Sequence, residues 1–100
     1  MYLARFSYHL LPKDRQRAID LIRREIGAAR QRGLTSRMLV PLTRGPDGAA
    51  LQFEIELRQL DELEQFRQKG IGDQTGSWMQ DFSGVLTAPP EVEILRVDEG

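Results

Sequence analysis

A nine-residue stretch, ALQFEIELR at positions 50–58, alternates between apolar and polar side chains almost without exception. The odd positions from 51 to 57 are all apolar, and the even positions between them are all polar. Successive side chains of a β-strand point to opposite faces of its sheet, so this pattern predicts a strand with one face in a hydrophobic core. A chain with such a strand must also supply neighbouring strands and a layer that covers the apolar face.

Three further segments have the character of strands: residues 2–10, which alternate and are rich in aromatic side chains, residues 36–43, SRMLVPLT, and residues 92–97, VEILRV. The turn sequence GPDG at 45–48 separates the second of these from the strand at 50–58, which predicts a hairpin. Because Pro41 has no backbone N–H to donate, we expect the strand at 36–43 to lie at an edge of the sheet.

The first helical region is predicted for residues 13–32, between Pro12, which suits the opening of a helix, and Gly33, which suits its end. Its apolar residues recur at spacings of three and four, and they predict this buried stripe: Ile19, Ile22, Ile26 and Ala29. The other faces hold a mixture of both charge signs, which predicts a solvated surface rather than a phosphate site: Arg15, Arg17, Arg23, Arg24 and Arg30 with Asp14, Asp20 and Glu25.

The second helical region begins at Asp61, which forms a capping-box pattern with Glu64. The stretch GIGDQTG at 70–76 interrupts this region, but it lacks the Lys-Ser/Thr ending and the preceding strand of a phosphate-binding loop. A second capping pattern at Ser77 begins the remaining part, which ends at Pro89. The order of elements is therefore β-α-β-β-α-β, in one domain that spans residues 1–100.

This order predicts the α+β class and a ferredoxin-like fold, with a four-stranded antiparallel sheet and both helices on one of its faces. The first and third strands are then central neighbours. The helix-facing side should hold one face of the last strand and the apolar positions of both central strands: Ala4, Phe6, Tyr8, Leu51, Phe53, Ile55 and Leu57. The opposite side should hold Leu3, Arg5, Ser7, His9, Gln52, Glu54 and Glu56, joined by Leu39.

Charge and composition exclude several classes of function. Fourteen basic and fifteen acidic residues give a net charge of -1, so we expect no nucleic-acid partner and no attraction to a membrane surface. The chain has no cysteine, no signal-peptide pattern and no apolar run of about 20 residues, the length that a membrane-spanning helix needs. We therefore expect a cytoplasmic protein.

His9 is the only histidine, and it is the candidate catalytic residue. Placed near a carboxylate it can act as a general base, whereas the alternative is an ordinary residue at the end of a strand. One histidine without cysteine cannot supply the usual ligands of a transition metal, so no metal site and no cofactor are expected. The serines lack the G-x-S-x-G pattern of a nucleophile elbow.

Two further features have both a functional and a structural interpretation. Glu54 and Glu56 lie two apart on one strand, a spacing that suits acid–base work but also suits ion pairs with Arg5 and Arg37 on neighbouring strands. Trp78 can form the wall of a ligand pocket, or it can pack between helix and sheet. For both features the structural interpretation is favoured.

The chain resembles the dimeric α+β barrel superfamily, and in particular its NIPSNAP-like branch, through four segments: LDELEQFRQK, the glycine-containing break, SWMQDFSGVL and the closing EVEILRV. Leu63, Phe66, Arg67 and Trp78 occupy positions typical of that branch. The resemblance implies that two copies associate through their sheets into a barrel with the helices outside. The polar sheet face would then line an internal pocket.

Two functions follow from this resemblance. The first is a homodimer without established catalysis that binds a small hydrophobic or oxygenated molecule in the barrel, or that acts in assembly. The alternative is a cofactor-independent monooxygenase or isomerase that acts inside the barrel. In the enzyme His9 is the candidate catalytic residue, and in either case a ligand would be contacted by Arg5, Ser7, Glu54, Glu56 and Trp78.

Overall fold

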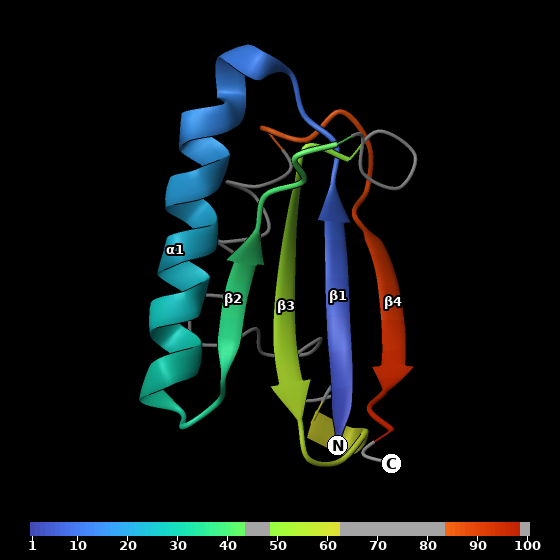
Figure 1. Cartoon of the computed structure of the whole chain (residues 1–100). Helices are drawn as coiled ribbons and strands as arrows, with labels where there is room; N and C mark the ends of the chain where they lie inside the picture. Colours follow the sequence, from blue (N-terminus) through green and yellow to red (C-terminus); the bar gives the residue numbers. More distant parts are fainter. Residues whose placement is uncertain (44–48, 63–83, 99–100) are drawn as a thin grey trace.

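The computed structural model describes residues 1–43, 49–62 and 84–98, and Figure 1 shows their arrangement. The elements are β1 (Tyr2–Tyr8), the short 3-10 helix η1 (Pro12–Asp14), α1 (Arg15–Gln31), β2 (Ser36–Leu39), β3 (Leu51–Leu57) and β4 (Glu91–Arg96). The predicted turn at 45–48, nearly all of the second helical region, its glycine-containing break and Trp78 lie outside the described residues.

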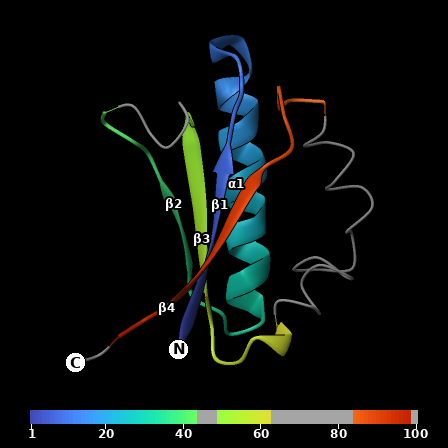
Figure 2. The ribbon, with the colours of Figure 1, turned by 90° about the vertical axis from the view of Figure 1, so that its right-hand side faces the viewer.

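The four strands form one antiparallel sheet in the order β2-β3-β1-β4. The first and third strands are thus central neighbours, as predicted, and β2 lies at an edge. Figure 2 shows α1 on one side of this sheet, and the two chain ends lie at the same end of it in Figure 1. The backbone N–H of Val97 donates to the carbonyl of Met1 at 3.0 Å, which holds these ends together.

Two strands are shorter than predicted. β2 ends at Leu39 rather than at residue 43, because Pro41 has no N–H to donate to β3. β1 ends at Tyr8, and Leu10 forms only an isolated bridge with Leu86. His9 therefore follows the strand rather than belonging to it.

The predicted core is confirmed for the two central strands, whose seven apolar side chains expected on the helix-facing side are all buried. On β4 the expectation fails, since Val92 and Ile94, which are paired with Phe6 and Ala4, are exposed. Phe6 and Phe53 are paired across β1 and β3, and their ring centroids lie 5.9 Å apart. Burial of apolar area at about 25 cal/mol per Å² makes this face the main source of stability.

The end of α1 is determined by Gly33, whose φ of 73° lies in the left-handed region. Gly33 N–H donates to the carbonyl of Arg30 at 3.0 Å, and Leu34 N–H donates to that of Ala29 at 2.9 Å. These two bonds form a Schellman motif, which satisfies carbonyls that the helix leaves unpaired. In the described part of the chain, no helix has the length and apolar character needed to cross a membrane.

The buried stripe of α1 is rotated from the predicted one. Ile22 and Ala29 are buried as expected, but Ile19 and Ile26 are only partly buried. The remaining buried positions are Ala18, Leu21 and Glu25. The prediction that Glu25 belongs to a solvated helix face is therefore wrong. The buried positions 18, 21, 22, 25 and 29 follow the helical period, and the residue at position 25 of this stripe is a glutamate.

Candidate functional site

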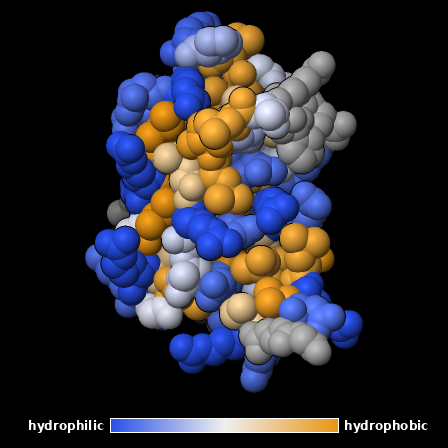
Figure 3. Space-filling model, viewed as in Figure 1, coloured by the Kyte–Doolittle hydropathy of each residue, from blue (hydrophilic) through white to orange (hydrophobic). Residues whose placement is uncertain are grey.

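The sheet side away from α1, called here the polar face, presents its side chains in rows that run across the strands. The register places these in the central row: Arg37, Glu54, Arg5 and Glu93. One neighbouring row consists of Leu39, Gln52, Ser7 and Glu91, and the other includes Glu56, Leu3 and Leu95. Figure 3 views the molecule from this side and shows apolar patches separated by hydrophilic side chains.

Glu54 is the centre of the polar face. Nε and Nη2 of Arg5 donate to its Oε1 at 3.1 and 2.7 Å, and Nε of Arg37 donates to its Oε2 at 2.7 Å. The Glu54 side chain is 2% exposed, against 31% for Arg5 and 62% for Arg37. Each carboxylate oxygen is therefore bound by a guanidinium from a different neighbouring strand, as the sequence predicted for ion pairing.

The ionisation of Glu54 follows from these contacts. Burial by itself raises the pKa of its carboxyl group, but the hydrogen bonds and charges of Arg5 and Arg37 outweigh it and hold the pKa below the ordinary value of 4.5. Glu54 is therefore an ionised structural anion at neutral pH, and not a proton donor.

Ser7 and Gln52 form a second buried polar contact on this face. Nε2 of Gln52 donates to Oγ of Ser7 at 3.1 Å, and the two residues are directly paired in the register of β1 and β3. They are 1% and 8% exposed. A buried amide and hydroxyl in contact add a neutral polar group beside the charged row.

His9 lies at one end of the polar face. Its Nε2 is 3.6 Å from Oε1 of Glu91, and its side chain is 18% exposed. The N–H of Thr87 donates to the His9 carbonyl at 2.9 Å, which fixes the backbone after β1. At 3.6 Å the two groups are within ion-pair distance but beyond hydrogen-bond reach, so Glu91 can act on His9 through its charge.

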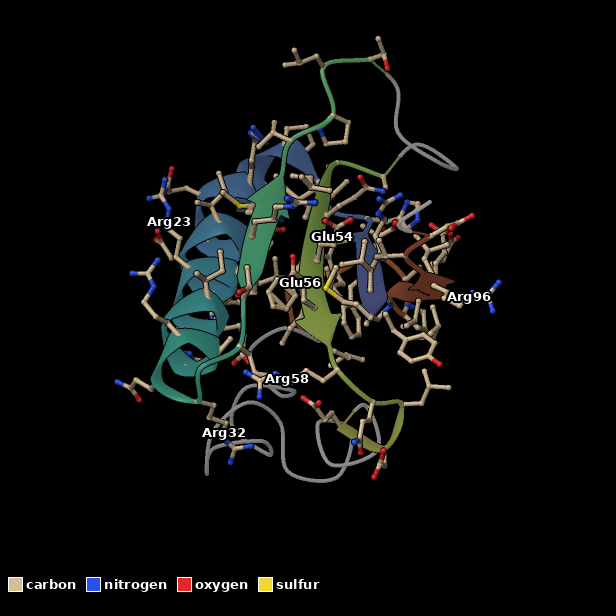
Figure 4. All side chains as sticks on the ribbon, turned by 60° about the horizontal axis from the view of Figure 1, so that its bottom comes forward. Arg23, Arg32, Glu54, Glu56, Arg58 and Arg96 are labelled. Carbon is tan, nitrogen blue, oxygen red and sulfur yellow. The ribbon has the colours of Figure 1, made fainter. Side chains whose placement is uncertain are left out.

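Glu56 differs from Glu54, although both lie on the same side of β3. Figure 4 shows them in succession along the strand, with Arg58 near its end. Among the described residues, none forms an ion pair or hydrogen bond with the Glu56 carboxylate. Glu56 and Arg58 line a small cavity of about 140 Å³ beside Met1 and Gly33. Within the described part of the chain, the two predicted carboxylates therefore differ, because only Glu54 is bound by arginine.

A buried ionisable group that the sequence did not predict lies on the other side of the sheet. Burial is the main cause that raises the pKa of Glu25 from 4.5 to about 7, and Arg24 partly opposes it. Tyr8 is 1% exposed, and burial together with the charge of Glu25 raises the pKa of its phenol. The sequence signal for this buried carboxyl group is the helical spacing of Glu25 from Leu21 and Ile22, which places it on the buried stripe of α1.

The structure therefore brings four of the predicted site residues onto one face: Arg5, Ser7, Glu54 and Glu56. His9 adjoins this face through Glu91 rather than through Glu54 or Glu56. Trp78 lies outside the described residues.

No protein-family model matches the chain, and no curated protein sequence matches it. Two solved structures are similar. Rv0793 from Mycobacterium tuberculosis matches with a TM-score of 0.75 and 18% identity, over 99% of this chain and 98% of that one. The 5-chloro-2-hydroxyhydroquinone dehydrochlorinase TftG from Burkholderia phenoliruptrix AC1100, in complex with 2,5-dihydroxybenzoquinone, matches with a TM-score of 0.51 and 16% identity, over 100% and 96%.

At these identities the similarity shows the fold alone. It supports the ferredoxin-like α+β fold that the order of elements predicted, with a four-stranded antiparallel sheet. It does not extend to the NIPSNAP-like branch or to the role of any residue.

Proposed function

We propose that the protein is a homodimer whose two polar faces enclose a site for a small oxygenated molecule. The observation that supports this most directly is Glu54, an ionised carboxylate that is 2% exposed on the sheet side away from α1. An anion bound by two arginines is an expensive arrangement for a surface that only meets water. It suits a face that a second sheet covers.

The apolar residues of the polar face support the same proposal. Leu3, Leu39 and Leu95 lie on it and retain partial exposure. In an antiparallel sheet with one side in solvent, the side chains of each strand usually alternate cleanly, with apolar residues on the buried side and polar residues on the exposed side. A face that mixes leucines with a charged row is typical of an interface, where apolar contact supplies affinity and charge supplies orientation.

The chemistry of the ligand follows from the two arginines. Each guanidinium has five N–H groups, and Glu54 accepts from only part of them. The remaining N–H groups suit carbonyl, phenolate or carboxylate oxygens. The similar structure of TftG holds 2,5-dihydroxybenzoquinone, a planar compound with such oxygens, which makes that compound the natural first probe. Ser7 is a further candidate contact, and so are Glu56 and Trp78.

The test combines sedimentation equilibrium with thermal shift. We expect a dimer at micromolar concentration and a rise in Tm with 2,5-dihydroxybenzoquinone. Arg5→Lys should reduce that rise, because lysine keeps the charge but loses the planar fork. Arg96→Lys is the matched control, since Arg96 is paired with Tyr2 at the far end of the sheet and is exposed. A monomer would refute the enclosed site. A dimer whose Tm does not respond to the probe or to related dihydroxyaromatic compounds would favour an assembly role.

The alternative is an enzyme, a cofactor-independent monooxygenase or isomerase, and the contact of His9 with Glu91 favours it. Both reactions begin with removal of a proton from an acidic O–H or C–H of the substrate. His9 would accept this proton, and the carboxylate of Glu91 would stabilise the imidazolium that forms. An isomerase would then return the proton to another atom of the same molecule.

This alternative is tested with His9→Ala, assayed for oxygen uptake and absorbance change on a panel of dihydroxyaromatic compounds. A catalytic His9 requires that the variant lose turnover while its Tm stays near that of the unmodified protein. Turnover that survives the substitution would remove His9 from the mechanism.

Location in the cytoplasm is also part of the proposal.

A further inference from the structure

The central row of the polar face alternates in charge across all four strands. Arg37 on β2, Glu54 on β3, Arg5 on β1 and Glu93 on β4 are direct neighbours in the register. We propose that this row sets the geometry of the dimer, with the two-fold axis parallel to the strands. The inference rests on the proposed homodimer and adds to it which residues of the two copies face each other.

A two-fold axis parallel to the strands, through the middle of the sheet, keeps every row at its own level and reverses its order. It places β2 of one copy over β4 of the second, and β3 over β1. Arg37 then faces Glu93 of the second copy, and Glu54 faces Arg5. Every position in the row meets the opposite charge, and each contact occurs twice, as a two-fold interface requires.

An axis across the strands gives the opposite result. If it passes through the central row, each residue meets its own copy, so Arg37 faces Arg37 and Glu93 faces Glu93. If it is shifted by half a row, the central row meets a neighbouring one. In one direction Glu93 then faces Glu91, and in the other Glu54 faces Glu56. Like charges that face each other disfavour all three arrangements.

The ends of the row contribute most to this choice. Glu54 already has both of its oxygens bound within its own chain. Glu93 has no ion pair within the described ranges, and its residue is exposed. Arg37 is 62% exposed and has N–H groups left after its contacts with Glu54. Among the described residues, Glu93 and the remaining N–H groups of Arg37 therefore lie at opposite edges of the sheet, where only an axis parallel to the strands brings them together.

The middle of the neighbouring row agrees with this geometry, whereas its ends place Leu39 over Glu91 of the second copy. The same axis places Gln52 over Ser7 of the second copy, so that amide and hydroxyl groups face one another. Packed sheets lie about 10 Å apart with strand directions within about 30°, a separation that long side chains such as arginine and glutamate span together.

The absence of cysteine from the chain allows a direct test by crosslinking. The Arg37→Cys and Glu93→Cys variants are unfolded in urea, refolded together so that subunits exchange, and treated with a bismaleimide that spans about 10 Å, the spacing of packed sheets. We expect crosslinked dimer in the mixture and none with either variant alone. Crosslinking of Arg37→Cys with itself would overturn the inference, because only an axis across the strands brings those positions together.

A second pair of cysteine variants provides the test if Arg37→Cys fails to fold, since that substitution also removes a partner of Glu54. Leu39→Cys with Glu91→Cys tests the same axis in the neighbouring row and leaves the Glu54 contacts intact. Sedimentation equilibrium of the unmodified protein distinguishes a failure of the proposed function from a failure of the proposed axis. A monomer refutes the proposed function itself. A dimer in which neither mixed pair crosslinks refutes only the proposed axis.

Discussion

Nη2 of Arg5 lies 2.7 Å from Oε1 of Glu54, although 49 positions separate the two residues in the sequence. This contact joins the two central strands on the polar face, and Arg37 extends it to the edge strand. The triad therefore links three strands through one buried carboxylate, so its parts should contribute unequally to stability.

Arg5→Ala should lower the free energy of unfolding by about 1–3 kcal/mol, because it leaves one oxygen of a buried carboxylate unpaired. Within a single chain Arg37→Ala should cost less, since Arg37 is twice as exposed as Arg5 and water can replace it when no second copy covers the face. Arg23→Ala, on the exposed side of α1, is the control and should stay within about 0.5 kcal/mol. Urea unfolding at pH 7 and a fixed protein concentration measures all three. A larger loss for Arg37→Ala than for Arg5→Ala would contradict this ranking.

Glu54 should make the protein sensitive to acid. Because its pKa is lower in the folded state than the ordinary 4.5, its contribution is fully present above pH 4.5. It is lost as the pH falls through the folded pKa, since the unfolded chain binds the proton more readily. Glu54→Gln should remove this part of the acid dependence and should also lower stability at pH 7. Melting curves between pH 3 and pH 7 measure it, and parallel profiles for the two proteins would refute the assignment.

Glu25 should act in the opposite sense and at higher pH. Its folded pKa of about 7 exceeds the ordinary 4.5, so the folded state binds more protons between these values and stability falls as the pH rises through them. Glu25→Gln should raise the free energy of unfolding at pH 8 by about 1–3 kcal/mol, with little gain at pH 4. Asp20→Asn is the control, because Asp20 is exposed on the same helix. Equal gains at both pH values would show that packing, and not ionisation, is responsible.

Gly33 and Gly27 form a matched pair for testing the end of α1. A Cβ at either position would meet no other atom within 4 Å, so the two sites differ in backbone conformation and not in space. Gly33→Ala should cost about 1 kcal/mol, because φ at this position is 73°. Gly27→Ala should add about 0.5–1 kcal/mol, because alanine favours a helix interior. Unfolding curves of both variants measure the difference, and a stabilising Gly33→Ala would be inconsistent with the Schellman motif.

The period of two in β1 and β3 was sufficient to predict which side chains enter the core. Ala4, Phe6 and Tyr8 are buried as a set because a strand has only two faces, and an error of one position would reverse every residue. A helix has no such restriction. Its buried stripe can rotate by one residue when the sheet is docked, and this rotation buried Glu25 where the sequence indicated a solvated surface.

The sequence by itself determined the order of the strands, the edge position of β2 and the composition of the two sheet faces, because these depend on local periodicity and on Pro41. Only the tertiary structure decided that Glu54 has two arginines, that Glu56 has none among the described residues, and that His9 lies beside Glu91. Those contacts depend on which positions are opposite one another in strands far apart in the chain. Periodicity assigns a residue to a face, whereas the register of the whole sheet assigns its partner.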